Sequence, residues 1–260
     1  MRIPLFQVDA FADRLFTGNP AAVCPLESWL PDQTLQSIAL ENNLAETAFF
    51  VPEGSTYRLR WFTPTIEVDL CGHATLASAY VLMNCLGLDC DRVAFQTRSG
   101  ELTVERRGDM YVLDFPSRPP QRCDVHPRLI EALGTVPVEV LGARDYLVAY
   151  QNEEQIRTLQ PNFALLAGMD RFAVSVTAPG ERHDFVSRFF APARGVPEDP
   201  VTGSAHCMLI PYWSRRLGKT EMRAFQASPR GGEVACELHG DRVKIAGRAV
   251  LYMEGVVHLT

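Results

Sequence analysis

The chain has 260 residues, of which 47% are hydrophobic, so it can bury a sizeable core in one large domain or in two domains of roughly 100 to 150 residues. Its formal charge of -6 and its pI near 5.6, without a run of lysines or arginines, exclude the basic surface that binding to nucleic acid or an anionic membrane requires. We therefore expect the partner to be a small molecule.

The amino-terminal segment predicts the cellular location of the protein, and this location predicts the redox state of its cysteines. Polar residues enter within the first few positions, too early for the apolar run of a signal peptide, so the sequence predicts a cytoplasmic location. In that compartment the seven cysteines are expected to be reduced thiols.

The pattern of apolar and turn-forming residues predicts the first elements in chain order. Strands are expected over 3–11 and 20–24, and a helix from Pro31, where a first helical position tolerates proline, to Asn42-Asn43. Alternating residues then predict strands over 48–51, 57–61, 92–97, 101–106 and 110–115, before a proline-rich stretch and a second series of strands and helices.

Two stretches without charged side chains, 70–88 and 200–213, each predict a helix that is apolar on all sides. His73, Ser78 and Asn84 interrupt the first stretch, which argues against a transmembrane span. A helix of this kind needs cover on every side, and a curled sheet around it supplies that cover.

The most informative feature of the sequence is a duplication. Arg60-Trp61-Phe62-Thr63-Pro64 precedes a helix start at Gly72, and Arg188-Phe189-Phe190-Ala191-Pro192 precedes another at Gly203. One folding unit present twice implies two similar domains related by a pseudo-twofold axis. Equivalent loops of such domains face each other, so the active site is expected between them.

The expected fold class is therefore α+β, with a curled mixed sheet around a central buried helix in each domain. Because Pro116, Pro119 and Pro120 cannot lie in a central strand, we place the domain boundary there, which gives domains of residues 1–117 and 118–260. The last strand of the second domain is free in this scheme to pair back with the first domain.

The two helix starts are candidate substrate-binding loops. Gly72 lies in the first, and Thr202, Gly203 and Ser204 follow Asp199 in the second. Glycine admits a ligand close to the backbone, and the free N–H groups of a first helical turn bind carboxylates and other anions. For either loop alone, glycines that only allow close helix packing are the better explanation, but the duplication favours a cradle for a small anionic substrate.

Glu46 is the candidate general base. It lies among small and apolar residues at the mouth of a predicted strand, where partial removal from water makes a carboxylate a stronger base. The alternative is a surface glutamate that caps a neighbouring backbone segment, and this stretch by itself does not decide between the two.

Three further candidates have structural alternatives. His73 can cap its own helix, and Asp199 can be an ordinary N-cap ahead of Pro200, although capping and catalysis are compatible. Cys71, at a helix start, can be a thiol whose pKa the helix lowers, but buried free cysteines are common and that alternative is preferred.

Motifs for metals and cofactors are absent from the sequence. Cys85 and Cys90 do not form a C-x-x-C pair, and His206-Cys207 has no second cluster at zinc-ligand spacing. Walker and G-x-G-x-x-G loops are missing, and no lysine stands out as a Schiff-base partner. We predict chemistry without a metal or a cofactor.

Several segments together resemble the phenazine-biosynthesis isomerase (PhzF-like) family, which has the fold of diaminopimelate epimerase. They cover nearly the whole chain, and in combination they are highly specific. The matching segments are Val8-Asp9-Ala10-Phe11, Phe16-Thr17-Gly18-Asn19-Pro20-Ala21, Ala45-Glu46-Thr47-Ala48-Phe49, Trp61-Phe62-Thr63-Pro64 through Cys71-Gly72-His73-Ala74-Thr75, Glu198-Asp199-Pro200-Val201-Thr202-Gly203-Ser204-Ala205-His206, and Gln226-Ala227-Ser228-Pro229-Arg230-Gly231-Gly232.

The resemblance implies a cofactor-independent isomerase, a homodimer, with its substrate between two similar domains. In the phenazine enzyme the substrate is a dihydro-hydroxyanthranilate, whose ring proton a glutamate removes and returns at another carbon. Glu46 matches this glutamate, and His73, Asp199 and Ser204 match positions that hold the substrate and assist the proton shuttle. The predicted catalytic residues are Glu46, His73 and Asp199, and the predicted substrate-binding residues are Asn19, Gly72, His73, Thr202, Gly203 and Ser204.

The leading hypothesis is that Glu46 moves a proton between carbons of a small carboxylate substrate, sheltered from water. A second hypothesis is an amino-acid racemase or epimerase that uses Cys71 with Asp199. Asp199 would take the place of a second cysteine, because the second loop contains none and Cys207 lies a full turn into its helix. A third is a small-molecule binding protein that does no chemistry, although binding alone would not need Glu46.

Overall fold

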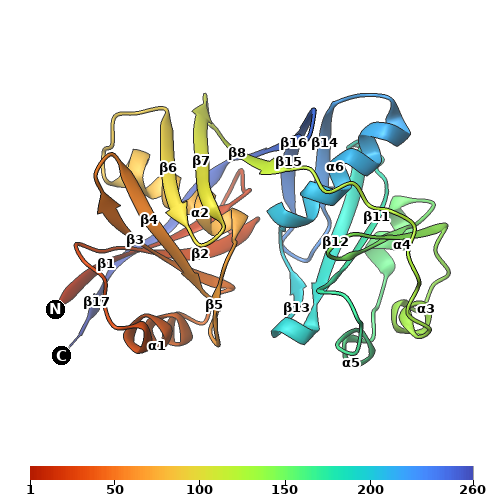
Figure 1. The fold of residues 1–260 in the computed structure, drawn as a ribbon, viewed down its shortest axis with the longest axis horizontal. Helices are drawn as coiled ribbons and strands as arrows, with labels where there is room; N and C mark the ends of the chain where they lie inside the picture. Colours follow the sequence, from red (N-terminus) through yellow and green to blue (C-terminus); the bar gives the residue numbers. More distant parts are fainter. Residues whose placement is uncertain (260) are drawn as a thin grey trace. The chain divides into compact units, whose positions relative to one another are not determined.

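The computed structural model describes residues 1–259, and the chain forms two compact units (Figure 1). Unit 1 contains residues 1–114 and returns at Ala246, whereas unit 2 contains Phe115–Ile245. The expected domains of residues 1–117 and 118–260 differ from these units mainly at the carboxyl end of the chain, where the sequence left the last strand free to pair back with the first domain. The physical reason is that strand β17 (Ala249–His258) pairs antiparallel along the whole of β1 (Arg2–Ala10), so the end of the chain completes the first sheet.

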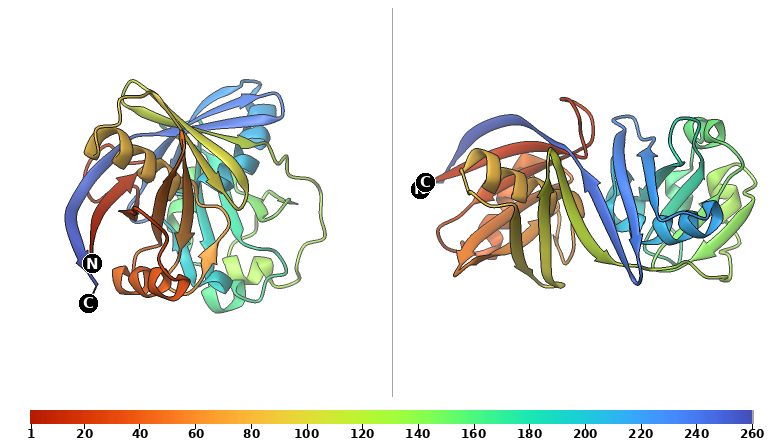
Figure 2. Two further views of the ribbon diagram at one scale, coloured as in Figure 1. Left: turned by 60° about the vertical axis from the view of Figure 1, so that its left-hand side comes forward. Right: turned by 90° about the horizontal axis from the view of Figure 1, so that it is seen from above.

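The sheet of unit 1 is mixed. β1 pairs antiparallel with β2 (Asn19–Pro25), β2 pairs parallel with β3 (Glu46–Glu53), and β3 pairs antiparallel with β4 (Thr56–Phe62). β4 then pairs antiparallel with β5 (Glu67–Val68) and parallel with β6 (Arg92–Thr97), which is followed by the antiparallel strands β7 (Gly100–Arg107) and β8 (Met110–Pro116). Beside β1, the backbones of Met1 and Leu259 exchange hydrogen bonds where the two ends of the chain meet (Figure 2).

Helix α1 (Asp32–Asn42) covers part of this sheet. Its buried residues Leu35, Ile38 and Ala39 pack into a core cluster with Phe49 and Phe62. The chain leaves the helix at Asn43 in the left-handed conformation, and the Asn43 N–H donates to the Ala39 carbonyl at 3.1 Å. The helix predicted from Pro31 to Asn42-Asn43 is confirmed, with Pro31 as the residue before its first turn.

Helix α2 (Gly72–Tyr80) is the buried helix of unit 1. Each of its residues from Gly72 to Ala79 is buried, and it packs against β1, β2 and β3 (Figure 1). A turn of π-helix, η1 (Val81–Cys85), follows in place of the single long helix that 70–88 predicts. Among residues 1–259 no helix combines the length and the apolar content that crossing a membrane requires.

Unit 2 repeats the order of pairings found in unit 1. β9 (Glu139–Gly142) pairs antiparallel with β10 (Tyr146–Ala149), β10 parallel with β11 (Val174–Pro179), and β11 antiparallel with β12 (Phe185–Ala191). β12 pairs antiparallel with β13 (Val196–Asp199) and parallel with β14 (Glu221–Gln226), which pairs antiparallel with β15 (Gly232–His239); β16 (Arg242–Gly247) follows. Short helices α3 (Leu129–Leu133), α4 (Glu153–Thr158) and α5 (Phe163–Leu166) and the 3-10 turn η2 (Pro192–Arg194) complete the unit. The mixed sheets with few helices confirm the α+β class.

Helix α6 (Gly203–Leu217) corresponds to α2, and Pro211 lies in its interior. Proline has no N–H, so the carbonyl of Cys207, four residues earlier, loses its partner within the helix. The backbone N–H of Arg118 donates to this carbonyl at 2.8 Å. The Cys207 carbonyl is therefore hydrogen-bonded in spite of the proline. The same hydrogen bond joins the proline-rich segment around Arg118 to α6.

The duplicated arginines make the same contacts in each unit. Arg60 on β4 forms a two-pronged ion pair with Glu67 on β5, with N···O distances of 2.7 and 2.8 Å. Arg188 on β12 forms one with Glu198 on β13, at 2.7 and 2.9 Å. Each guanidinium also lies over the phenylalanine two residues later in its own strand. The sequence repeat is therefore a repeat of structure.

Candidate active site

In unit 1 the predicted residues converge at the start of α2. Asn19 is the first residue of β2 and Glu46 the first of β3, and these strands are parallel neighbours, so both side chains lie at the same edge of the sheet. Cys71 precedes α2, Gly72 begins it and His73 is its second residue. The fold thus brings together residues that are more than fifty positions apart in the sequence.

The ring of His73 lies between a carboxylate and a thiol. Its Nε2 atom is 3.2 Å from Glu46 Oε2, and its Nδ1 atom is 3.5 Å from Cys71 Sγ and 3.2 Å from Asn19 Nδ2. The side chains of His73 and Glu46 are only 5% and 16% exposed. The imidazole therefore has a carboxylate at one nitrogen and an amide and a thiol at the other, and the carboxylate–imidazole pair is suited to proton transfer.

The pair of Glu46 and His73 has unused hydrogen-bonding capacity. At 3.2 Å the two atoms form an ion pair but not an aligned hydrogen bond, and both Glu46 Oε2 and His73 Nε2 are buried without a hydrogen-bond partner. Buried polar atoms are normally hydrogen-bonded, and a bound ligand is one of the ways in which such atoms gain a partner. A substrate group can therefore bind at this edge of the ring.

Burial and neighbouring charges shift the pKa values of His73 and Cys71. Burial lowers the pKa of His73, but the negative charges of Cys71 and Glu46 and hydrogen bonds to both residues outweigh it, so the pKa is raised above 6.5. Burial, followed by the Glu46 carboxylate, raises the pKa of Cys71 to about 11. This pKa fits the preferred interpretation of Cys71 as an ordinary buried thiol, because the cost of desolvating the thiolate outweighs the effect of the helix start. Near neutral pH Cys71 is therefore a protonated thiol, and the raised pKa of His73 favours the charged form of the ring.

The same three side chains are the candidate metal ligands among the described residues. Glu46, Cys71 and His73 each place one ligand atom within 4.8 Å of the other two. The two ring nitrogens of His73, however, face different partners, Nδ1 toward Cys71 and Nε2 toward Glu46. One ion cannot bind all three groups unless the ring turns, so the arrangement suits proton transfer better than metal binding.

In unit 2 the predicted residues lie around the start of α6. Thr202 Oγ1 donates to Asp199 Oδ2 at 2.5 Å, and the Arg144 guanidinium donates to Ser204 Oγ at 3.2 Å. Asp199 is not the N-cap that one interpretation of the sequence expected. It ends β13, and Thr202 takes the N-cap position because Pro200 and Val201 separate Asp199 from the helix.

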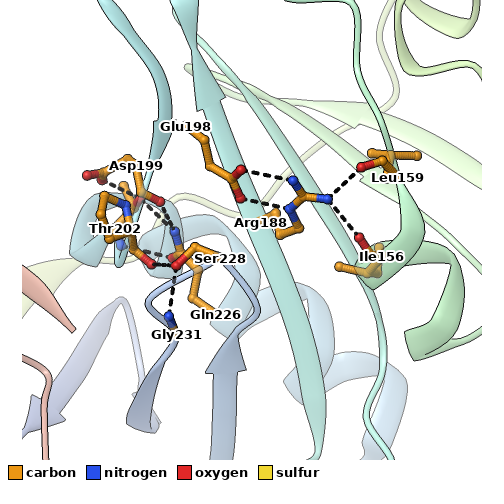
Figure 3. A network of polar contacts seen from close by, with 10 residues as sticks. Ile156, Leu159, Arg188, Glu198, Asp199, Thr202, Gln226, Ser228 and Gly231 are labelled. Carbon is orange, nitrogen blue, oxygen red and sulfur yellow. Dashed lines mark hydrogen bonds and ion pairs between the residues drawn. The ribbon is translucent and has the colours of Figure 1, made fainter. Parts of the chain in front are cut away.

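Sequence reasoning did not single out Gln226, which holds this loop in place (Figure 3). Its Nε2 atom donates to the Asp199 carbonyl at 2.7 Å and to Thr202 Oγ1 at 3.1 Å, and its Oε1 atom accepts from the Thr202 N–H at 2.9 Å. Nearby, Ser228 Oγ donates to the Pro200 carbonyl at 2.8 Å. Gln226 and Ser228 lie in a segment that matches the family, but nothing in its pattern tells which backbone they hold.

His206 has a structural role within α6. Its Nδ1 atom is 2.9 Å from the Thr202 carbonyl, one turn earlier, just as Thr75 Oγ1 donates to the Cys71 carbonyl in unit 1. Burial lowers the pKa of His206 to about 4, so the ring is neutral. Burial likewise raises the pKa of Cys207 to about 11, so Cys207 is a protonated thiol near neutral pH. It does not provide the second thiolate that a racemase with two opposed cysteines would need.

Comparisons with known proteins identify the family. The family model described as phenazine biosynthesis-like protein matches residues 8–255. The chain belongs to this phenazine biosynthesis-like family. It is 55% identical over 259 residues to an uncharacterized isomerase of Pseudomonas aeruginosa, a match that covers 100% of both chains.

Solved structures of the family have the same fold. A PhzF-family protein of Enterococcus faecalis superimposes with a TM-score of 0.97 at 48% identity and covers 100% of each chain. A hydroxyproline epimerase of Agrobacterium vitis, solved with bound trans-4-hydroxy-L-proline, has a TM-score of 0.62 at 11% identity and covers 98% of this chain and 92% of its own. The fold is thus the epimerase type that the resemblance implied, and the protein is an enzyme of the isomerase class.

Proposed function

We propose that this phenazine biosynthesis-like protein is a cofactor-independent isomerase in which Glu46 moves a proton between carbons of a small carboxylate substrate. The observation that supports this most strongly is the buried Glu46 and His73 pair, with an unpartnered oxygen and nitrogen 3.2 Å apart. Glu46 removes the proton from one carbon and, as a carboxylic acid, returns it to another. His73 stabilises the negative charge that develops on the substrate between these steps.

The substrate class is proposed from the anion-binding capacity of the two helix starts. The first N–H groups of α2 and α6 have no partner within their helices, which are 9 and 15 residues long. Such N–H groups at the start of a helix attract carboxylates. We assign substrate binding to Asn19, Gly72, Thr202, Gly203 and Ser204, together with His73, and a second acid-base role to Asp199. Dihydro-hydroxyanthranilate is the first substrate to test, on the family resemblance.

The test is incorporation of deuterium from heavy water, measured by mass spectrometry, into dihydro-hydroxyanthranilate and a panel of amino acids. Glu46→Gln keeps the size of the side chain but cannot accept a proton, so exchange and turnover should fall by at least about 100-fold. The matched control is Glu41→Gln, at an exposed position five residues earlier, which should leave both rates unchanged. Full turnover in Glu46→Gln would show that another group is the base.

Racemisation by Cys71 with Asp199 is a second candidate, supported by the 3.5 Å distance from Cys71 Sγ to His73 Nδ1. The raised pKa of Cys71 opposes it, because the thiolate is the reactive form. In this mechanism Cys71→Ala abolishes exchange into an amino acid while Glu46→Gln retains it. The third candidate, a binding protein without chemistry, requires binding with no deuterium exchange in any compound.

A homodimer is proposed on the family resemblance alone, and a cytoplasmic location on the early polar residues of the amino-terminal segment. Light scattering measures the mass of the assembly directly. A mass near the 29.0 kDa of the single chain at micromolar concentration would contradict the dimer.

A further inference from the structure

The two nitrogens of the His73 ring have different partners, and this difference determines where the ring can carry a proton. Nε2 faces the Glu46 carboxylate at 3.2 Å, which can only accept. Nδ1 faces the Asn19 amide nitrogen at 3.2 Å, which can only donate, and the Cys71 thiol at 3.5 Å. A nitrogen that accepts a hydrogen bond from Asn19 cannot itself carry a proton.

Asn19 is held rigidly enough to impose this choice. It is fully buried, and its backbone pairs with Ala10 in the ladder between β1 and β2. The preceding Gly18 has a φ of 66°, and a side chain there would collide with the Ala10 carbonyl. The turn therefore fixes the backbone position from which the Asn19 amide reaches the ring, with its Nδ2 atom 3.2 Å from Nδ1.

We propose that Asn19 is a positioning residue that keeps the neutral His73 ring protonated on Nε2, facing Glu46. The proton of the neutral ring is then available to Glu46 alone. Asn19 closes Nδ1 to the Cys71 thiol, so Cys71 takes no part in the transfer. The catalytic meaning of this arrangement rests on the proposed function, whereas the position of the proton is a property of the protein without substrate.

The titratable groups that face the ring are Glu46 at Nε2 and Cys71 at Nδ1. A second proton on Nδ1 would point at the amide nitrogen, donor against donor, so Asn19 opposes the charging of the ring that Glu46 favours. An aspartate at position 19 has nearly the same shape but accepts hydrogen bonds instead of donating them. Asn19→Asp should therefore move the proton of the ring to Nδ1 and favour the doubly protonated form.

The test is nitrogen NMR of the full chain with labelled histidine rings, followed from pH 6 to pH 10 without substrate. The His73 signals are assigned by their loss in His73→Gln. His206 serves as an internal reference of opposite type, because its Nδ1 donates to the Thr202 carbonyl and its proton must lie there. We expect the neutral His73 ring to carry its proton on Nε2 in at least about nine molecules of ten. This ratio corresponds to a free-energy difference of roughly 1.4 kcal/mol between the two tautomers.

Two variants separate Asn19 from Cys71. Cys71→Ala should leave the proton of neutral His73 on Nε2, whereas Asn19→Asp should reverse the ratio. The proposal is overturned if wild-type neutral His73 carries its proton on Nδ1, or if Cys71→Ala moves it. Should Asn19→Asp fail to fold, the wild-type spectrum and Cys71→Ala still decide the matter, and neither result depends on whether Glu46 is the base.

Discussion

At the scale of single residues, the two duplicated arginines join neighbouring strands by the same chemistry. Arg188 is more deeply involved, because it also donates to the carbonyls of Ile156 and Leu159 at the end of α4 (Figure 3). The side chains of Arg188 and Glu198 are 10% and 14% exposed, so water cannot replace a lost partner well. A broken ion pair of this kind leaves a charge in a poorly solvated place.

Arg188→Met should therefore lower the free energy of unfolding by about 3 to 5 kcal/mol, measured by urea denaturation. Arg58→Met is the control, since Arg58 is 60% exposed and 3.6 Å from an exposed Glu53. Its cost should stay below about 1 kcal/mol. Equal costs in the two variants would mean that the Arg188 ion pair adds nothing to stability.

His206 should make stability fall in weakly acidic solution. Its pKa is about 4 in the folded chain, because burial opposes the charge, against 6.5 when exposed. The unfolded chain binds the proton first as the pH falls, so stability is complete above pH 6.5 and is lost toward pH 4, by about 3 kcal/mol. His73 has the opposite effect on stability, because its pKa is raised in the folded chain and its contribution is lost as the pH rises.

Urea denaturation between pH 7 and pH 4 checks this, with His206→Gln compared to wild type. The variant should lose less stability than wild type over this range, whatever its stability at pH 7. Parallel curves for the two proteins would contradict a neutral buried His206.

At the scale of elements, tight connections at the ends of strands place the functional side chains. Between β1 and β2 the chain turns through Gly18, and Asn19 follows at once. β2 and β3 then run parallel, which puts Asn19 and Glu46 at one edge next to the start of α2.

Gly18→Ala should destabilise the protein more than Gly54→Ala, although both glycines have a positive φ, of 66° and 62°. An added side chain at Gly54 meets nothing within 4 Å, so that variant reports the backbone strain alone, about 1 kcal/mol. At Gly18 the same atom collides with the Ala10 carbonyl, which should add about 2 kcal/mol or more. Thermal unfolding of both variants measures the difference, and equal losses would show that the turn can widen.

At the scale of the whole molecule, the chain builds two units with one order of strand pairings, but the units are not consecutive stretches of sequence. Unit 1 is completed only when the chain returns at Ala246 and β17 pairs with β1. β17 also contacts the buried helix α2. The stability of the first unit therefore depends on the last residues of the chain.

Removal of everything after Ile245 should consequently destabilise unit 1. It leaves one edge of β1 unpaired and uncovers part of the core, so the unfolding temperature by calorimetry should fall by about 10 °C or more. A chain that ends at Leu259, and so keeps all of β17 and the hydrogen bonds to Met1, is the control and should unfold like the wild type. An unchanged unfolding temperature in the shorter chain would mean that β17 is dispensable.

Much of the candidate site could be proposed from the sequence, because short segments carry the residue types that its chemistry needs. Glu46 among small residues, and the helix starts at Gly72 and Gly203, follow from short segments of sequence. Cys71 illustrates the opposite case, since a helix start predicts a lowered pKa whereas burial raises it to about 11. Burial depends on the surrounding residues, which no local pattern describes.

The α+β class, the duplication, the buried helices and the family follow from the amino-acid sequence, because apolar periodicity and repeated motifs are properties of short segments. The folded chain was needed to see that β17 completes the first unit, that Gln226 holds the loop at Asp199, and that Asn19 and Glu46 contact opposite sides of the His73 ring. These facts depend on which distant segments pair and on the direction in which each side chain then points, and spacing along the chain fixes neither.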